Sequence, residues 1–134
     1  MQLAPMQCDA TAQVAAFLQQ RAGAVRARGV AAERIVLDPG VGFGKTPAQN
    51  FGLLSAQRGL LELGYPLLVG WSRKSSLGQA TGLAAGERLV PSVAAALLAV
   101  ERGARIVRVH DVKDTVAALQ VWRAASQETG KDMA

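Results

Sequence analysis

Three short apolar segments divide this sequence, and each leads directly into a polar motif and then into a stretch with helical periodicity. The segments cover residues 35–37, 66–70 and 105–109. Their polar ends lie roughly 30 to 40 residues apart, the length of one strand–helix unit. Strands connected through helices in this way run parallel, with right-handed crossovers. The sequence therefore predicts an α/β fold in which all three motifs meet at the carboxyl edge of one sheet, where such folds bind ligands.

The segments around these strands carry apolar residues at helical spacing. Helices are expected over approximately residues 9–28, 49–63, 75–82, 91–102 and 112–125. Four of them are followed by glycines that act as stop signals, Gly29, Gly64, Gly82 and Gly103. Residues 1–8 and 127–134 carry no clear pattern and are expected to be flexible, and a length of 134 residues predicts a single domain.

Composition limits the class of protein further. Half of the residues are hydrophobic, which is enough for a buried core, and the single cysteine, Cys8, excludes an internal disulfide and suits a reducing compartment. No apolar run has the length of a membrane span, and residues 1–10 lack the pattern of a secretory leader. We therefore expect a cytoplasmic protein that does not insert into a membrane.

The charge pattern bears on possible partners. The formal net charge is +5, but the basic residues are scattered along the chain and only Arg73 and Lys74 are adjacent. Nucleic-acid binding usually requires a clustered basic surface, so we do not expect it here. A small anionic substrate fits a distributed positive field.

A glycine loop follows the first apolar segment. Residues 38–46 read Asp-Pro-Gly-Val-Gly-Phe-Gly-Lys-Thr, with a glycine at every second position from Gly40 to Gly44. Such a loop permits positive φ and close approach of the backbone to a ligand, and its N–H groups can form a concave polar site. The loop narrowly misses a Walker A motif, because Pro39 replaces the required first glycine, and it also misses a dinucleotide fingerprint. A nucleotide loop and a tight turn without a ligand remain alternatives at this point.

The other two motifs favour an anionic ligand. Residues 70–76 read Gly-Trp-Ser-Arg-Lys-Ser-Ser, which places two cations among serine hydroxyls at the start of a helix. Arg108 and the only histidine, His110, share one face of the third strand and together could hold a phosphate. Asp111 can cap the helix that follows. Trp71 and Trp122 are assigned to packing.

Together the three motifs resemble the last three strand-end signatures of the dihydropteroate synthase family, and the resemblance extends over about residues 10–125. It implies a partial (β/α)8 TIM barrel that contains the last three strands with their flanking helices. The family condenses 4-aminobenzoate with a dihydropterin methyl diphosphate to give dihydropteroate and diphosphate in folate synthesis. Its 4-aminobenzoate slot is also where sulfonamides compete.

The resemblance also implies roles for individual residues. Asp38 would accept hydrogen bonds from the pterin, Gly42 and Phe43 would wall the aminobenzoate slot, and Ser75 would bind the benzoate carboxylate. Lys74 would contact the pterin carbonyl side and position 4-aminobenzoate. The implied catalytic residues are Lys74, Arg108 and His110, and the implied substrate-binding residues are Asp38, Gly42, Phe43, Gly70, Lys74, Ser75, Arg108 and His110. Arg108 would cover the pterin face and, with His110, hold the diphosphate.

The resemblance implies Mg²⁺ as a cofactor, but the protein ligand of the metal lies in family strands that this sequence lacks, so no metal ligand is assigned here. The chain is expected to be inactive or nearly so by itself, and a homodimer or a complementing N-terminal half are the expected protein partners. Two alternatives stay open beside a synthase. One is a non-catalytic half-barrel or remnant, and the other is a pterin-dependent methyltransferase domain.

Overall fold

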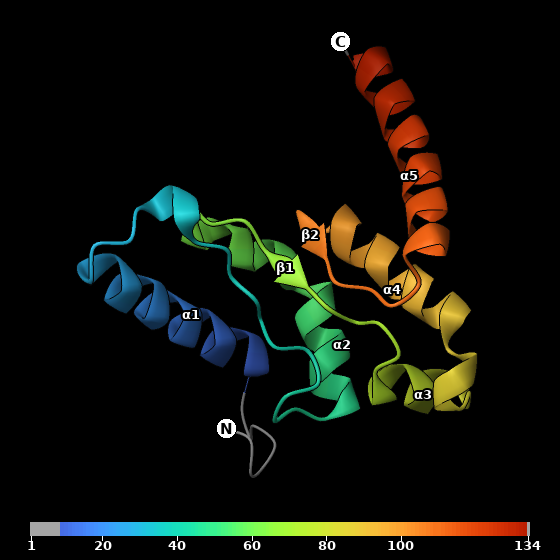
Figure 1. Ribbon diagram of the computed structural model, residues 1–134, viewed down its shortest axis with the longest axis horizontal. Helices are drawn as coiled ribbons and strands as arrows, with labels where there is room; N and C mark the ends of the chain where they lie inside the picture. Colours follow the sequence, from blue (N-terminus) through green and yellow to red (C-terminus); the bar gives the residue numbers. More distant parts are fainter. Residues whose placement is uncertain (1–8, 134) are drawn as a thin grey trace.

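The computed structural model describes residues 9–133, in which helices pack against a small parallel sheet (Figure 1). The α-helices are α1 (Ala10–Ala27), α2 (Pro47–Ser55), α3 (Ser75–Thr81), α4 (Leu89–Glu101) and α5 (Val112–Met133). The 3-10 turns are η1 (Ala32–Arg34), η2 (Gln57–Leu63) and η3 (Ala85–Glu87), and the strands are β1 (Leu68–Val69) and β2 (Ile106–Val107). Residues 1–8, including Cys8, lie outside the described residues, so their expected flexibility stays a prediction.

The sheet is parallel, as predicted. Leu68 on β1 pairs with Ile106 on β2. The predicted first strand is wrong in extent, because residues 35–37 join β1 only through an isolated parallel bridge between Leu37 and Leu67. The backbone N–H of Leu37 donates to the carbonyl of Pro66 at 2.9 Å, and the N–H of Leu68 donates to the carbonyl of Leu37 at 2.8 Å. The ladder stops there because proline, which follows Asp38, has no N–H to donate.

Two of the predicted helices have different bounds in the structure. The helix expected over residues 49–63 is divided into α2 and η2, because the buried side chain of Gln57 occupies the division and its Nε2 donates to the carbonyl of Ala99 at 2.9 Å. The last helix, expected to end near Ala125, continues to Met133, and Figure 1 shows α5 projecting beyond the rest of the molecule.

The predicted helix signals are confirmed at several ends. The side chain of Asp9 accepts from the N–H groups of Thr11 and Ala12 and caps α1. Thr46 and Gln49 form a reciprocal capping box at the start of α2. The four predicted glycine stops all adopt positive φ: Gly29, Gly64, Gly82 and Gly103.

The core lies between the sheet and the helices. Its most buried apolar side chains, at 0 or 1% exposure, are Leu53, Leu60, Leu67, Val69 and Ala99. The opposite face of the sheet is open, because Val36 and Ile106 are 45% and 44% exposed. Among the described residues, no helix is both long and apolar enough to cross a membrane.

Leu67 is the side chain whose removal tests this arrangement most directly, since it is fully buried where all three extended segments meet. We expect Leu67→Ala to lower the free energy of unfolding by about 2 to 5 kcal/mol, through lost burial and the cavity left behind. Val90→Ala is a matched control at a 75% exposed position on α4 and should change stability by less than about 0.5 kcal/mol. Urea denaturation followed by circular dichroism measures both, and equal losses would contradict this account of the core.

Candidate functional site

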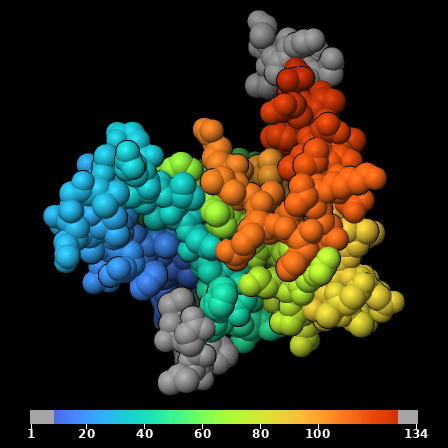
Figure 2. Space-filling view, in the orientation of Figure 1, coloured from blue at the N-terminus to red at the C-terminus, as the bar shows by residue number. Residues whose placement is uncertain are grey.

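The three polar motifs meet where the extended segments end, as the sequence predicts. In Figure 2, the cyan, light green and orange parts of the chain, which carry the glycine loop, the segment after β1 and the segment after β2, come together on the viewed face. Side-chain contacts join the three motifs, between Asp38 and Arg108, between Phe43 and Lys74, and between Ser72 and His110. The parallel sheet therefore brings together residues that are distant in sequence.

The glycine loop has the predicted left-handed turns. Gly40, Gly42 and Gly44 have φ values of 73°, 89° and 66°. Asp38 stabilises the first turn, since its Oδ1 accepts from the N–H of Gly40 at 2.9 Å. A residue with a β-carbon would be strained at these positions.

Lys45 turns into this loop. Its Nζ donates to the carbonyls of Gly40 at 2.7 Å and Phe43 at 2.9 Å, and the residue is only 9% exposed. Burial lowers the pKa of Lys45, and the nearby negative charge of Asp38 partly opposes that shift. Thr46 is engaged in the cap of α2. Neither residue of the apparent Walker motif is therefore available to a phosphate, which argues against the nucleotide alternative.

The side chains of Lys74 and Phe43, which come from two different motifs, are in contact at the site. The Lys74 ammonium lies 4.7 Å from the centroid of the Phe43 ring, within cation–π range. Gly42 allows this approach, because a β-carbon there would lie 3.3 Å from Cδ of Lys74. Phe43 remains 44% exposed, so its ring also presents an apolar surface to a ligand. Ser75 follows Lys74 as the first residue of α3 and is exposed.

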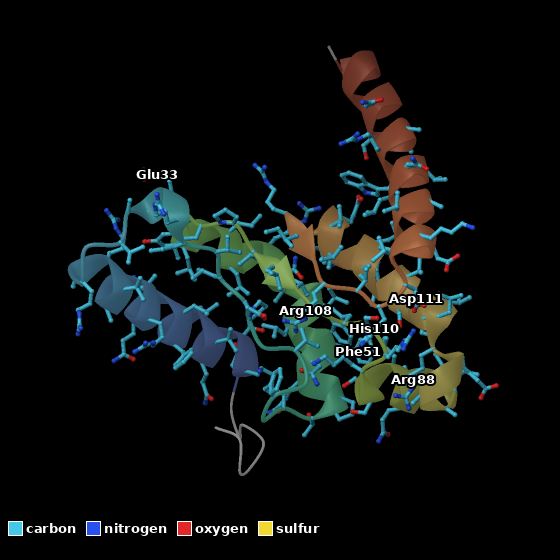
Figure 3. All side chains as sticks on the ribbon, in the orientation of Figure 1. Glu33, Phe51, Arg88, Arg108, His110 and Asp111 are labelled. Atoms are coloured by element: carbon cyan, nitrogen blue, oxygen red, sulfur yellow. The ribbon has the colours of Figure 1, made fainter. Side chains whose placement is uncertain are left out.

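Arg108 lies across the end of β1 (Figure 3). Its Nη1 is 3.7 Å from Oδ2 of Asp38, and both side chains are well exposed. A β-carbon at Gly70 would lie only 2.7 Å from Nη2 of Arg108, so glycine leaves room for the guanidinium. An exposed pair of this kind contributes at most about 1 kcal/mol, so a ligand can displace it from Asp38 at little cost.

His110 and Asp111 connect the segment after β2 to the segment after β1 through hydrogen bonds and an ion pair. The Oγ of Ser72 lies 2.8 Å from Nδ1 of His110 and also accepts from its backbone N–H at 3.1 Å. Arg73 forms an ion pair of 3.1 Å with Asp111. The predicted joint action of Arg108 and His110 on a phosphate is not tested by these contacts, since Arg108 faces Asp38 whereas His110 faces Ser72. Hydrogen bonding at Nδ1 leaves Nε2 of His110 available to a ligand.

Two buried polar residues of the site, Asn50 and Ser92, were missed in the sequence. Asn50 accepts from Gly42 and donates to Ser76, and the Oγ of Ser92 accepts from the N–H of Arg73 at 2.9 Å. Arg73 needs this support because its φ of 58° is unusual for a residue other than glycine. A usable signal existed, since Asn50 and Ser92 occupy the apolar faces of α2 and α4, where a polar residue is expected to have a partner.

Within residues 9–133 there is no group of three or more His, Cys, Asp or Glu residues that could hold a metal ion. Asp38 is already engaged by Gly40 and Arg108. The described residues therefore do not fit a magnesium site, and no chemical step is derived through one.

Comparison with known proteins shows the class to which this fold and site belong. A family model described as pterin binding enzyme matches residues 1–110, so the chain belongs to the family of pterin-binding enzymes. The dihydropteroate synthase of Neisseria meningitidis serogroup B (strain MC58) is 51% identical over 128 residues, which are 92% of this chain and 45% of that protein. The dihydropteroate synthase of Escherichia coli K12 is 43% identical over 124 residues, 92% of this chain and 44% of that protein.

Solved structures agree with this relationship. Dihydropteroate synthase from Stenotrophomonas maltophilia with active site-bound imidazole superposes with a TM-score of 0.91 at 51% identity, over 94% of this chain and 48% of that chain. Xanthomonas albilineans dihydropteroate synthase with 4-aminobenzoic acid gives 0.90 at 48% identity, over 92% and 45%. The resemblance to dihydropteroate synthases is therefore confirmed, and the chain spans somewhat less than half the length of these relatives.

The lowered pKa of Lys45 predicts a pH dependence of stability. Between the lowered pKa in the folded chain and the ordinary value of 10.5 in the unfolded chain, the unfolded state binds more protons. The free energy of unfolding of the wild type, measured relative to Lys45→Met, should therefore rise as pH rises through this window and level off above it. Urea titrations at several pH values from 7 to about 11 measure this difference, and parallel pH profiles for the two proteins would show that Lys45 is not buried as described.

Proposed function

We propose that this chain supplies the pterin and 4-aminobenzoate sites of a dihydropteroate synthase, an enzyme that joins 4-aminobenzoate to a dihydropterin methyl diphosphate. The observation that carries the proposal is the placement of the Asp38–Arg108 pair beside the Phe43–Lys74 contact at one edge of the sheet. Relatives whose solved structures contain 4-aminobenzoic acid and 7,8-dihydropteroate support the choice of ligands. A methyltransferase domain has no comparable support here.

Each side chain suits its proposed role. Asp38 offers a carboxylate oxygen to the N–H groups of a pterin once Arg108 moves from it, and a carboxylate suits two parallel donors. Arg108 would then cover the pterin face in the space above Gly70. Phe43 and Gly42 would wall the aminobenzoate slot.

Lys74 and Ser75 would hold the two ends of the reacting pair. The Lys74 ammonium would contact the pterin carbonyl and position 4-aminobenzoate, whose carboxylate would accept a hydrogen bond from Ser75. Both residues stand at the start of α3, so the helix fixes their relative position. His110 would direct Nε2 towards the diphosphate.

The proposed reaction breaks one bond and forms another at the same carbon. The bond from the pterin methylene carbon to the diphosphate oxygen breaks, and the diphosphate leaves with the electron pair. The amine nitrogen of 4-aminobenzoate then forms a bond to that carbon and releases one proton. Positive charge from Arg108, Lys74 and His110 would stabilise the charge that develops on the departing diphosphate.

We also propose that the chain forms part of one (β/α)8 barrel domain, as its last three strands with their helices. The open face of the sheet, with Val36 and Ile106 exposed, supports the need for further strands. Activity would then require those strands, whether the same protein carries them or a complementing partner supplies them. The magnesium ion expected for the family would take its protein ligands from that remaining part.

Calorimetric titration tests the proposed binding. The purified chain is titrated with a pterin diphosphate analogue, alone and in the presence of 4-aminobenzoate. We expect binding that Asp38→Ala and Lys74→Ala both abolish, because they remove the pterin acceptor and the cation beside Phe43.

Two variants with the same change of charge serve as controls. Glu62→Ala and Arg34→Ala lie at exposed positions in η2 and η1, away from the three motifs, and should bind as the wild type does. Loss of binding in these controls would indicate a nonspecific charge effect. Binding of the analogue that survives both site variants would overturn the proposed pterin site.

A further inference from the structure

The buried side-chain amide of Asn50 connects two parts of the site. None of the proposed ligand contacts involves this amide. Asn50 lies in the first turn of α2 and is 1% exposed. Its Oδ1 accepts from the backbone N–H of Gly42 at 3.0 Å, and its Nδ2 donates to Oγ of Ser76 at 3.0 Å. The orientation of this amide is fixed by chemistry, because the N–H of Gly42 is a donor only and must face the oxygen.

The two partners of Asn50 belong to the two segments that are proposed to form the walls of the aminobenzoate slot. Gly42 precedes Phe43 in the glycine loop, whereas Ser76 follows Lys74 and Ser75 in α3. Ser76 is itself only 2% exposed, so the connection lies in the interior beneath both walls. One side chain thus bonds to a loop on one side and to a helix on the other.

The spacing between these walls leaves little room for change. The Lys74 ammonium lies 4.7 Å from the Phe43 ring centroid, and Gly42 is so close to the Lys74 stem that a β-carbon would come within 3.3 Å of it. The glycine loop is otherwise adaptable, since its glycines have few conformational restrictions. A fixed bond from α2 to this loop and to α3 is therefore well placed to set their separation.

We propose that Asn50 is a positioning residue that sets the distance between the Gly42–Phe43 loop and the start of α3, and thereby the width of the aminobenzoate slot. Asn50 touches neither substrate and acts through Gly42 and Ser76. The link to the slot rests on the proposed function, whereas the link between the loop and the helix does not.

The test compares Asn50→Leu with Gln57→Leu. Both changes replace a buried amide by a side chain of similar size, but Gln57 bonds to the carbonyls of Ala99 and Arg102, away from the site. The ring-current shift of the Lys74 ε-protons, identified by its loss in Phe43→Leu, reports the spacing of the walls without any ligand. Hydrogen exchange of the Gly42 amide reports the loss of its acceptor.

We expect Asn50→Leu to reduce the ring-current shift and to speed exchange at Gly42 by about tenfold or more, while Gln57→Leu changes neither. Affinity for 4-aminobenzoate should fall by about tenfold or more through misplacement of the walls, with the affinity for the pterin analogue at Asp38 unchanged. Ser76→Ala removes only one of the two hydrogen bonds of Asn50 and should change the same measurements by a smaller amount. This variant therefore tests the proposal even if Asn50→Leu does not fold.

Three results are decisive. An unchanged ring-current shift in a folded Asn50→Leu or Ser76→Ala would overturn the proposal. Equal loss of affinity for both ligands would also overturn it, because that pattern indicates general destabilisation. A third outcome is that the variants alter the spectroscopic signals but the wild type binds neither the pterin analogue nor 4-aminobenzoate. That outcome would support the positioning role of Asn50 and contradict the proposed function.

Discussion

The parallel alignment of three extended segments is the constraint on which the site depends. Leu37 bridges to Leu67, and β1 pairs with β2, so the three segments end at the same edge. Because parallel strands require crossovers, the chain must leave this edge three times in the same direction. Each departure is a loop that carries a polar motif, and α2, α3 and α5 begin directly after them.

Buried hydrogen bonds then give these loops their shape. A polar group that is buried without a partner costs free energy, so the groups beneath the loops restrict which conformations are allowed. Lys45 satisfies two carbonyls inside the glycine loop, and Ser92 supports the left-handed backbone of Arg73. The half-buried side chain of Lys74 and the exposed side chain of Arg108, which would meet a ligand, therefore project from backbone that these buried hydrogen bonds hold in place.

The strand–helix alternation and the glycine stops were predictable from the sequence because they depend on local spacing and on backbone freedom. The direction of individual side chains was not predictable in the same way. Lys45 and Lys74 both lie within strand-end motifs, yet Lys45 turns inward to loop carbonyls while Lys74 lies over Phe43. The local sequence pattern could not distinguish the two lysines. The partners of Lys45 are carbonyls of its own loop, whereas the partner of Lys74 is an aromatic ring from another motif.

The division of the helix expected over residues 49–63 has a similar origin, since the partners of Gln57 are carbonyls at the end of α4. Asn50 was overlooked for the opposite reason: its place on an apolar face was visible, but its partners, Gly42 and Ser76, belong to separate motifs. The division of the helix at Gln57 and the role of Asn50 both depend on contacts between different elements. The spacing of residues within one element does not predict such contacts.

The open face of the sheet and the candidate site are physically continuous. In each extended segment, the apolar residue on the open face stands two positions before a site residue on the same face. These pairs are Val36 with Asp38, Leu68 with Gly70, and Ile106 with Arg108. Whatever covers the apolar row must therefore also approach the Asp38–Arg108 pair, excluding water from it and strengthening its electrostatic interactions. Completion of the proposed barrel and completion of the site would accordingly be one event, which explains why a chain with most of its own site contacts formed would still depend on the remaining strands for activity.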